Sequence, residues 1–358
     1  MSLATTAAGA LPTATDSALS WLVTHRLTDG SYGGCSELQT APASYALWLA
    51  YNDAPNVTIS YTFLKNQMDN STTYFWNGGA CSPKEADIPG EILYSFDASQ
   101  NLARLNLAFV GPKLLSFQQP NGGFLGYEDT TLGQVTSSVD TSMALWGLIN
   151  AKAIPSSNQT AAINYLLRLQ NPDGSFNLTN TVSSASLYSL GPEPISITAL
   201  VVRVLKDAGL TANNSHIASA LNFLNNALTA NFGGHVYAAS LATLAFTAFN
   251  QTSNASAAAT FIISQQKSDG GFADSIRSAT TSNALDTGWA AVALQTLQGS
   301  GSVGGRLFPM GVLSRLPSLV ALVMMALIGA SILIVREYRR PRFLRKLQSG
   351  SSVTNTKN

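Results

Sequence analysis

Residues 114–149 read LLSFQQPNGGFLGYEDTTLGQVTSSVDTSMALWGLI, and the rest of the chain repeats the pattern of this stretch. Apolar residues at helical spacing lead into a Pro-Asn-Gly-Gly turn that begins at Pro120. This turn ends a helix, because proline lacks the amide donor and glycine tolerates positive φ. An aromatic residue, Phe124, follows at once, and Asp140 with the two hydroxyl residues after it caps a second apolar helix. The stretch therefore predicts a helix, a glycine-rich aromatic turn and a second helix.

The same pattern recurs along the chain. Related turns occur in residues 21–32 (WLVTHRLTDGSY), 165–176 (YLLRLQNPDGSF) and 261–272 (FIISQQKSDGGF), with more divergent copies in 63–79 and 223–234. Turns that lie roughly 40–60 residues apart are typical of stacked helix pairs. The second helix of each pair is expected at 43–51, 102–110, 140–149, 195–205, 236–249 and 286–297. The pattern thus predicts six helix pairs.

The Q-x-x-D-G-[SG]-[FY] turn between two helices resembles the repeat of the terpenoid cyclase and protein prenyltransferase β-subunit superfamily. The resemblance covers about residues 16–297. It implies an all-α domain at 16–298, an α6/α6 toroid whose inner and outer helix rings surround a funnel-shaped cavity. The turn aromatics are expected to wedge between neighbouring helix pairs at one end. Residues expected to open the inner helices at that end are Glu37, Glu91, Asp97, Asp140, Glu193, His235 and Asp286.

Composition and charge restrict the function classes. The chain has 358 residues, of which 46% are hydrophobic, so one repetitive domain with a large core can absorb most of its length. The net charge of +1 hides an asymmetry: residues 1–315 hold 13 Lys/Arg against 18 Asp/Glu, and the remainder holds 7 against 1. A mildly acidic body with a basic tail makes nucleic acid an unsuitable partner for the body.

The C-terminal region predicts a membrane anchor. A Gly/Ser-rich linker is expected at 299–315, and residues 316–335 read LPSLVALVMMALIGASILIV, twenty residues without a charge. Such a segment spans a bilayer as one helix. The basic tail at 336–358 belongs on the cytoplasmic side, because positive charge is retained there. The expected location is therefore the cell membrane, with a single pass, the N-terminal toroid outside and the tail inside.

The first fifteen residues, MSLATTAAGALPTAT, are small and polar. They lack the basic start and apolar run of a signal peptide, and we expect residues 1–15 to form a disordered leader. A signal segment upstream of Met1 is the alternative that would reconcile this leader with an outside toroid.

Cysteines and sequons bear on the same location. Cys35 and Cys81 lie in loops at comparable places of neighbouring repeats, and a disulfide between them is the simplest interpretation outside the cell. A zinc pair is the weaker alternative, because no further Cys or His has ligand spacing. Asn-x-Ser/Thr sequons, which accept glycans only on translocated surfaces, occur at Asn56, Asn70, Asn158, Asn177, Asn213, Asn250 and Asn254.

The resemblance implies site chemistries that the sequence does not reproduce. Triterpene cyclases of this superfamily protonate an alkene with a D-x-D-D motif, whereas only Asp140 stands in the comparable sequence here. They also line the cavity with aromatic residues that stabilise carbocations, and here the aromatic spacing indicates core. Protein prenyltransferases hold zinc with Asp, Cys and His, and no such set is recognisable. No cofactor and no metal are therefore expected.

A third related group is the thioester domain of complement-like proteins, whose Cys-Gly-Glu-Gln crosslinks cysteine to glutamine. The segment from Cys35 to Gln39, Cys-Ser-Glu-Leu-Gln, resembles it superficially. It has one residue too many between Cys and Gln, and Ser36 replaces the glycine that the tight ring needs. A motif without its geometry is weak evidence for a thioester.

The leading hypothesis is a non-catalytic, membrane-anchored extracytoplasmic module that binds a ligand or acts as a scaffold. Its ligand class stays open among an apolar small molecule, a lipid, a glycan and a protein. The alternative is a divergent prenyltransferase- or terpene cyclase-like enzyme acting on isoprenoids or glycans. Its weak catalytic candidates are Glu128, Asp129, Asp140, Glu193 and His235. For Asp140 and Asp286 helix capping is the plainer role. Carboxylates clustered in one deep pocket would favour the enzyme, and a cavity filled by side chains would favour the scaffold.

Overall fold

The computed structural model describes residues 4–34, 36–70, 76, 85–129, 133–179, 194–275 and 280–301. Residues 1–307 form one compact unit. Several predicted features lie outside the described residues: Cys35, Cys81, Glu193, the apolar segment 316–335 and the basic tail 336–358.

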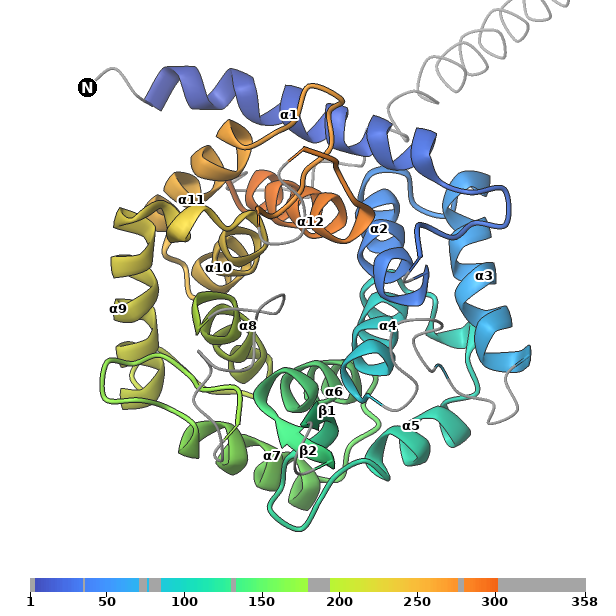
Figure 1. Cartoon of the computed structure of the whole chain (residues 1–358), viewed down its shortest axis with the longest axis vertical. Coiled ribbons are helices and arrows are strands. Elements are labelled where there is room, and N and C mark those ends of the chain that lie inside the picture. Colours follow the sequence, from blue (N-terminus) through green and yellow to red (C-terminus); the bar gives the residue numbers. More distant parts are fainter. Residues whose placement is uncertain are drawn as a thin grey trace, which may run out of the picture. The chain divides into compact units, whose positions relative to one another are not determined.

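Helices alternate between an outer and an inner ring along the chain (Figure 1). The outer ring consists of α1 (Ala4–His25), α3 (Pro55–Asn70), α5 (Leu107–Leu115), α7 (Ser156–Arg168), α9 (Ser215–Thr229) and α11 (Thr252–Ser264). The inner ring consists of α2 (Ser36–Tyr51), α4 (Asp87–Ala98), α6 (Ser138–Asn150), α8 (Pro194–Asp207), α10 (Val236–Ala248) and α12 (Ala284–Gly301). The predicted α/α toroid of six helix pairs is confirmed.

Regular structure besides these helices is short. The strands β1 (Phe124–Asp129) and β2 (Gly133–Ser137) form an antiparallel hairpin that leads directly into α6. The 3₁₀ helices η1 (Leu102–Arg104) and η3 (Asn231–Gly234) lie in connections. The described chain is thus helical apart from one small hairpin.

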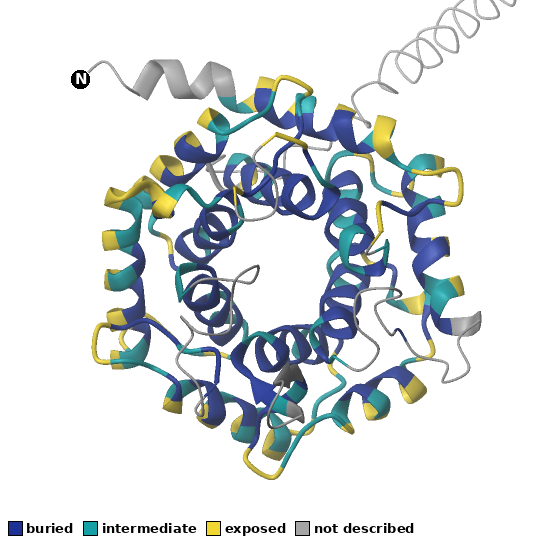
Figure 2. Ribbon diagram, in the orientation of Figure 1, coloured by how far each residue is buried: buried dark blue, intermediate teal, exposed yellow. Residues whose placement is uncertain are grey.

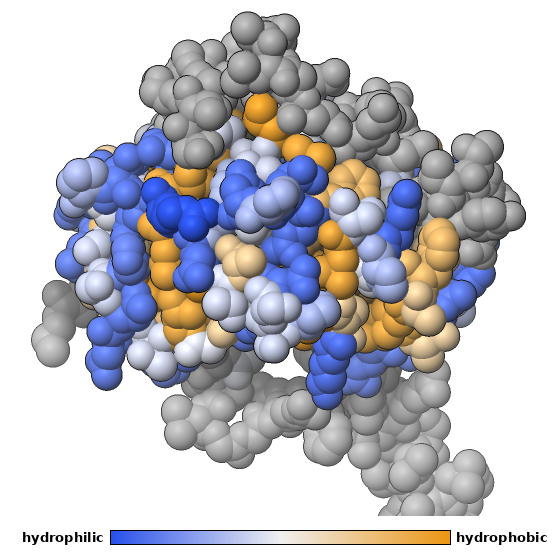
Figure 3. Space-filling model, turned by 90° about the horizontal axis from the view of Figure 1, so that it is seen from below, coloured by the Kyte–Doolittle hydropathy of each residue, from blue (hydrophilic) through white to orange (hydrophobic). Residues whose placement is uncertain are grey.

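Burial separates the two rings. Inner helices are buried nearly all round, whereas outer helices bury one side and expose the other (Figure 2). Accordingly, α10 reads VYAASLATLAFTA, with small and apolar residues on every face. Figure 3 shows the outer wall as hydrophilic residues with hydrophobic ones between them. Among the described residues, the large exposed hydrophobic side chains, Leu27, Tyr51 and Phe109, are scattered singly, which is ordinary for a protein surface.

A repeated contact fixes each turn to its following inner helix. The amide of Phe124 donates to Thr141 Oγ1 across 2.9 Å, and Phe176 with Thr198 and Phe272 with Thr287 repeat this contact at 2.9 Å. Tyr32 and Thr40 form the same bond at 3.1 Å. The four aromatic side chains are at most 1% exposed. The turn aromatics of these four repeats are thus buried, and their role as staples between helix pairs stays a prediction.

One inner helix was placed wrongly by the sequence pattern. The predicted helix at 102–110 corresponds to η1 and the start of the outer helix α5, and the inner helix is α4. The helix α4 accommodates both Pro89 and Gly90. Pro89 occupies the first turn, where no intrahelical donor is needed. A Cβ on Gly90 would lie 2.3 Å from the Met143 carbonyl carbon, so glycine lets α4 and α6 approach closely.

Three helix boundaries also differ from the sequence prediction. The leader 1–15 is helical from Ala4 onward, because α1 packs its apolar side on the ring: Ala14 is 4% exposed, and its carbonyl accepts from Gln266 Nε2 at 2.8 Å. The inner helix α2 begins at Ser36 rather than residue 43 and accommodates Pro42. At the other end, α12 extends to Gly301, into the predicted linker.

Candidate functional site

The first turns of neighbouring inner helices contact one another. Asp140 Oδ1, in the first turn of α6, accepts from the amides of Ala86 and Asp87 at the start of α4, at 3.2 and 3.3 Å. Gln39 Oε1, near the start of α2, accepts from the Ala284 amide that begins α12, at 3.3 Å. These contacts show that neighbouring inner helices run parallel. Their N-terminal residues therefore gather at one end of the space that the ring encloses, here called the lumen.

A buried acid reaches across the lumen from α4. Glu91 is 3% exposed, and its Oε1 accepts a hydrogen bond from Trp289 Nε1 of α12 across 2.8 Å. Because α2 lies between α4 and α12 in the ring, this contact joins helices that are not neighbours (Figure 1). Burial raises the pKa of Glu91 to about 8, and the hydrogen bond from Trp289 opposes part of this rise. The carboxyl is thus largely protonated at neutral pH.

Four aromatic side chains from four inner helices meet beside Glu91, and we call them the aromatic layer: Tyr45, Tyr94, Trp146 and Trp289. Trp146 of α6 stacks on Tyr94 of α4 with ring centroids 3.8 Å apart, and on Trp289 at 5.7 Å. Tyr45 of α2 meets Tyr94 edge to face at 5.7 Å. Trp146 and Trp289 are 0% and 1% exposed. The aromatic layer therefore crosses the lumen and fills it at this level.

A cationic side chain of the protein lies against the aromatic layer. The guanidinium of Arg203, on α8, lies 5.3 Å from the ring centroid of Trp146. Asp207, one turn further along α8, pairs with Arg203 at 2.5 Å and accepts from Trp146 Nε1 at 2.8 Å. The geometry is that of a cation–π contact whose charge is balanced by a carboxylate.

Asp140 and Asp87 form a second acidic group at the start of α4 and α6. Asp140 Oδ2 accepts from Ser137 Oγ, while its Oδ1 holds the start of α4. Burial raises the pKa of Asp140 to about 7. Burial and then the charge of Asp140 raise the pKa of Asp87. Both oxygens of Asp140 are therefore engaged in joining two helices, which is the predicted capping role extended to a neighbouring helix.

The last repeat shows that this role is structural. Asp286, at the equivalent place in α12, accepts from the Asp274 amide at 2.8 Å. Asp274 in turn accepts from the Tyr237 amide at the start of α10 at 3.0 Å, and it pairs with His235 Nδ1 at 3.0 Å. In the α6 repeat, Gly126 follows the turn aromatic by two residues, as Asp274 does, and the carboxyl of Asp140 fills the space of the missing side chain.

The predicted candidates are therefore divided by the structure. Asp140 and His235 sit in helix-joining contacts at two different places of the ring. Glu128 and Asp129 lie on β1, and Glu193 is outside the described residues. Asp97 stands at the end of α4 rather than at the start of an inner helix, which corrects its predicted position.

Three polar atoms at the N-terminal end of the lumen are buried without a partner. They are Glu37 Oε2 on α2, and Ser138 Oγ and Ser142 Oγ on α6. Ser142 and Ser138 precede Trp146 by one and two helical turns, so the three side chains share a face of α6. Glu37 precedes Tyr45 by two turns and shares its face of α2. These unpaired atoms thus lie on the N-terminal side of the aromatic layer, the end at which Glu91 also stands.

Glu91 is among the residues predicted to open inner helices, but it is not among the catalytic candidates chosen from sequence. A signal was present: Glu91 interrupts the apolar run of α4, DIPGEILYSFDA, at a position where a solvated charge has no place. Its partner Trp289 carries no local signal, because a tryptophan in an apolar helix is usually core.

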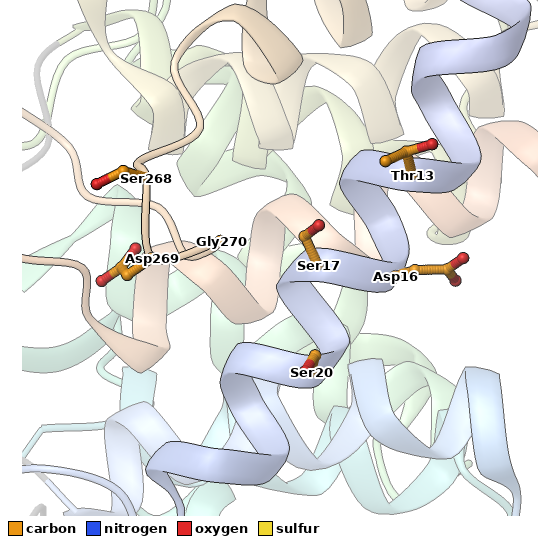
Figure 4. Close-up of a pocket in the computed structure, with 7 residues that line it drawn as sticks. All are labelled: Thr13, Asp16, Ser17, Ser20, Ser268, Asp269 and Gly270. Carbon is orange, nitrogen blue, oxygen red and sulfur yellow. The ribbon is translucent and has the colours of Figure 1, made fainter.

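A shallow hollow on the outside of the ring is a separate feature (Figure 4). It measures about 450 Å³ and is lined by Thr13, Asp16, Ser17, Ser20, Ser268, Asp269 and Gly270. Asp269 accepts from the Gly271 amide, Ser282 Oγ and Trp21 Nε1, so its carboxylate is used by the turn and by ring closure. The carboxylate of Asp269 is therefore not free to bind a ligand in this hollow.

The described ranges contain neither a membrane-spanning helix nor a metal-binding cluster of side chains. Across residues 4–301 with their gaps, no helix is long and apolar enough to cross a membrane. The same part of the chain brings together no group of three or more His, Cys, Asp or Glu side chains that could hold a metal ion.

Family models match two parts of the chain. The model described as the A-macroglobulin TED domain matches residues 98–261, which exclude the segment from Cys35 to Gln39 that resembles a thioester motif. The model described as the prenyltransferase alpha-alpha toroid domain matches residues 233–315. Each match spans less than half of the chain, and no curated protein matches it.

Solved structures share the fold at low sequence identity. A variant of the type II terpene cyclase MstE from Scytonema, in complex with geranylgeranyl dihydroxybenzoate, is 13% identical with a TM-score of 0.61, covering 82% of this chain and 98% of its own. The ent-copalyl diphosphate synthase from Streptomyces platensis is 12% identical with a TM-score of 0.51, covering 74% and 50%. A possible GH105 family member from Salmonella enterica is also 12% identical with a TM-score of 0.51, covering 80% and 93%. These similarities establish the α/α toroid fold.

Proposed function

We propose that this protein is a terpene cyclase-like enzyme that takes an isoprenoid chain into the lumen of its toroid and protonates it from Glu91. The observation that carries the proposal is the contact of Glu91 with Trp289 beside the aromatic layer. It places a protonated acid next to a surface of π electrons, which are the two things that a carbocation cyclisation needs. The similarity to type II terpene cyclases supports the same choice at the level of fold.

Glu91 suits the role of a general acid better than the acids selected from sequence. Its pKa of about 8 keeps the proton on the carboxyl at neutral pH. Since Trp289 donates to Oε1, the proton resides on the other oxygen. Asp140, by contrast, uses both oxygens to hold helix ends together. The donor would therefore be divergent, a glutamate on α4 in place of a D-x-D-D motif.

The aromatic layer supplies the second requirement. Trp146 already carries the guanidinium of Arg203 at 5.3 Å, so this surface favours a positive charge. A carbocation formed beside Glu91 would be stabilised by the same interaction, and an apolar wall would keep water from it.

The proposal is tested by product analysis of the purified full chain in detergent. Squalene and geranylgeranyl dihydroxybenzoate are incubated with the wild type, with Glu91→Gln and with Asp53→Asn, which changes an exposed carboxylate outside the lumen. The proton that Glu91 adds to the substrate is balanced when the final carbocation loses a proton to form an alkene, which allows the Glu91 carboxylate to be protonated again. Mass is therefore conserved, and products are isomers separated by chromatography and identified by mass spectrometry. We expect product from the wild type and Asp53→Asn and a loss of at least 100-fold in Glu91→Gln. Product formation that survives Glu91→Gln in a folded variant would refute the assignment.

A second candidate function is the binding or scaffold module expected from the sequence. It is favoured by the burial of Trp146 and Trp289, whose stacked side chains occupy part of the lumen. In that case an apolar small molecule, lipid, glycan or protein binds without reaction. Saturable binding of both isoprenoids without any product from the wild type would select this function.

The cellular location remains the proposal made from sequence: a toroid outside the cell, anchored by residues 316–335. The apolar segment and the basic residues that follow it support this orientation. Protease added to intact cells should remove the toroid and spare the tail. Protection of the toroid from protease in intact cells that are known to expose other surface proteins would reverse the orientation.

A further inference from the structure

We infer that the N-terminal end of the lumen binds an uncharged, hydrogen-bond-donating head group, such as a hydroxyl, through Glu37, Ser138 and Ser142. This inference deepens the proposed function and rests on it in taking the lumen as the ligand site. It adds which end of an isoprenoid ligand is recognised, and by which residues.

The first observation is the set of unpaired atoms. Ser138 and Ser142 are fully buried, Glu37 is 2% exposed, and Ser138 Oγ, Ser142 Oγ and Glu37 Oε2 have no hydrogen-bond partner. A buried polar atom without a partner costs folding free energy, so such atoms are rare and call for a reason. Three of them at one end of one lumen are satisfied together if a polar ligand group binds there.

The second observation is their placement. Glu37 is the second residue of α2, while Ser138 and Ser142 are the first and fifth residues of α6. Because the inner helices run parallel, all three belong to the same end. The helix α4 lies between α2 and α6 in the ring and contributes Glu91 at its fifth residue (Figure 1). The hydroxyls, the carboxyl and the proposed acid thus belong to the same end of the lumen.

The direction of the side chains follows from the helix period. Trp146 contacts Trp289 of α12, which is not adjacent to α6, so this face of α6 looks into the lumen. Ser138 and Ser142 lie on that same face. The aromatic layer forms an apolar floor beneath them.

The site does not suit an anionic head group. Burial raises the pKa of Glu37, and Asp87 and Glu91 have raised pKa values at the same end. Carboxyls that hold their protons supply no charge to balance a phosphate or carboxylate, and burying an unpaired anion in a medium of low dielectric constant is costly. The lumen cation Arg203 lies in the third turn of α8 and is paired with Asp207. A donor such as a hydroxyl is compatible with the acceptor oxygen of Glu37 and with both serines.

Three probes with the same hydrocarbon chain test the inference: geranylgeraniol, its methyl ether and geranylgeranyl diphosphate. Binding to the full chain in detergent is measured by calorimetry. We expect the alcohol to bind about tenfold more tightly than the ether, which lacks the donor, and at least tenfold more tightly than the diphosphate. Equal affinity for alcohol and ether, tighter binding of the diphosphate, or binding of none of the three would overturn the inference.

Variants separate the head-group site from the rest of the lumen. The double variant Ser138→Ala/Ser142→Ala removes two groups that have no partner in the fold, so it should fold normally. It should weaken the alcohol about tenfold and leave the ether unchanged. Ser157→Ala, an exposed serine on the outer helix α7, is the matched control. If the alcohol is preferred and no product ever forms, the cyclase proposal fails alone; if product forms without the preference, this inference fails alone.

Discussion

The indole nitrogen of Trp289 donates a hydrogen bond to Glu91 Oε1 across 2.8 Å, although 198 positions separate the two residues. The contact joins α12 to α4 across the lumen and passes over the helix α2 between them. It fixes which oxygen of Glu91 is an acceptor and turns the carboxyl toward the aromatic layer.

Replacing Trp289 with Phe should raise the pKa of Glu91 above its present value of about 8. The hydrogen bond from Trp289 stabilises the ionised carboxylate, and phenylalanine cannot donate it. The carboxyl stretching band in infrared titration reports this directly, and the basic limb of the pH–rate profile should move in the same direction. Trp48→Phe is the control, since Trp48 Nε1 is buried without a partner. A fall in the pKa, or the same shift in both variants, would contradict the proposed contact.

The pH dependence of stability should carry the signature of Glu91. Its pKa is raised from 4.5 in the reference state to about 8 in the fold, so the folded protein binds the proton more tightly than the unfolded chain. Stability from this group is complete below about pH 4.5 and is lost as the pH rises toward 8, with a slope of up to about 1.4 kcal/mol per pH unit. Asp140, with its pKa raised from 3.8 to about 7, adds a slope of the same sign.

Urea unfolding at a series of pH values between 5 and 9 measures this slope. Glu91→Gln keeps a neutral side chain at every pH, so its slope should be shallower than that of the wild type. A wild-type stability that rises with pH over this range, or a slope that Glu91→Gln leaves unchanged, would rule out a protonated Glu91 in the fold.

The turn aromatics should dominate the stability of the ring. Phe124 is fully buried and its amide is bound to Thr141, so Phe124→Ala should cost about 3–5 kcal/mol in chemical unfolding. Phe109→Ala removes a phenylalanine that is 38% exposed and should cost much less. A loss below about 1 kcal/mol at Phe124 would mean that the turn aromatics are not the staples between repeats.

If the toroid is translocated, its sequons should differ in how often they carry a glycan. Asn213 and Asn250 are exposed. By contrast, Nδ2 of Asn158 donates to Gln118 Oε1 at 2.6 Å, and Nδ2 of Asn254 donates to Asn225 Oδ1 at 2.6 Å. Glycopeptide mass spectrometry after secretion from a eukaryotic host should find glycans at Asn213 and Asn250 and little at Asn158. Full occupancy at Asn158 with none at Asn213 would contradict the structure.

The sequence by itself determined the toroid, because its evidence is local and repeated. Each turn needs a glycine, an aromatic residue and a following helix start within a short stretch, and several copies reinforce one another. The same locality explains the one misplaced helix. Pro89 and Gly90 are poor helix formers by themselves, although the first turn of α4 tolerates proline and the neighbouring helix requires glycine at that point.

Only the tertiary structure decided the candidate site. Asp140 looked like a possible acid and proved to hold two helix starts together, whereas Glu91 and Trp289 each looked like an ordinary position in an inner helix. Their meaning depends on ring closure, which places α12 and α4 on either side of α2 and removes the carboxyl of Glu91 from water. Burial sets the pKa of Glu91, and burial is a property of the whole ring, which no local stretch of sequence contains.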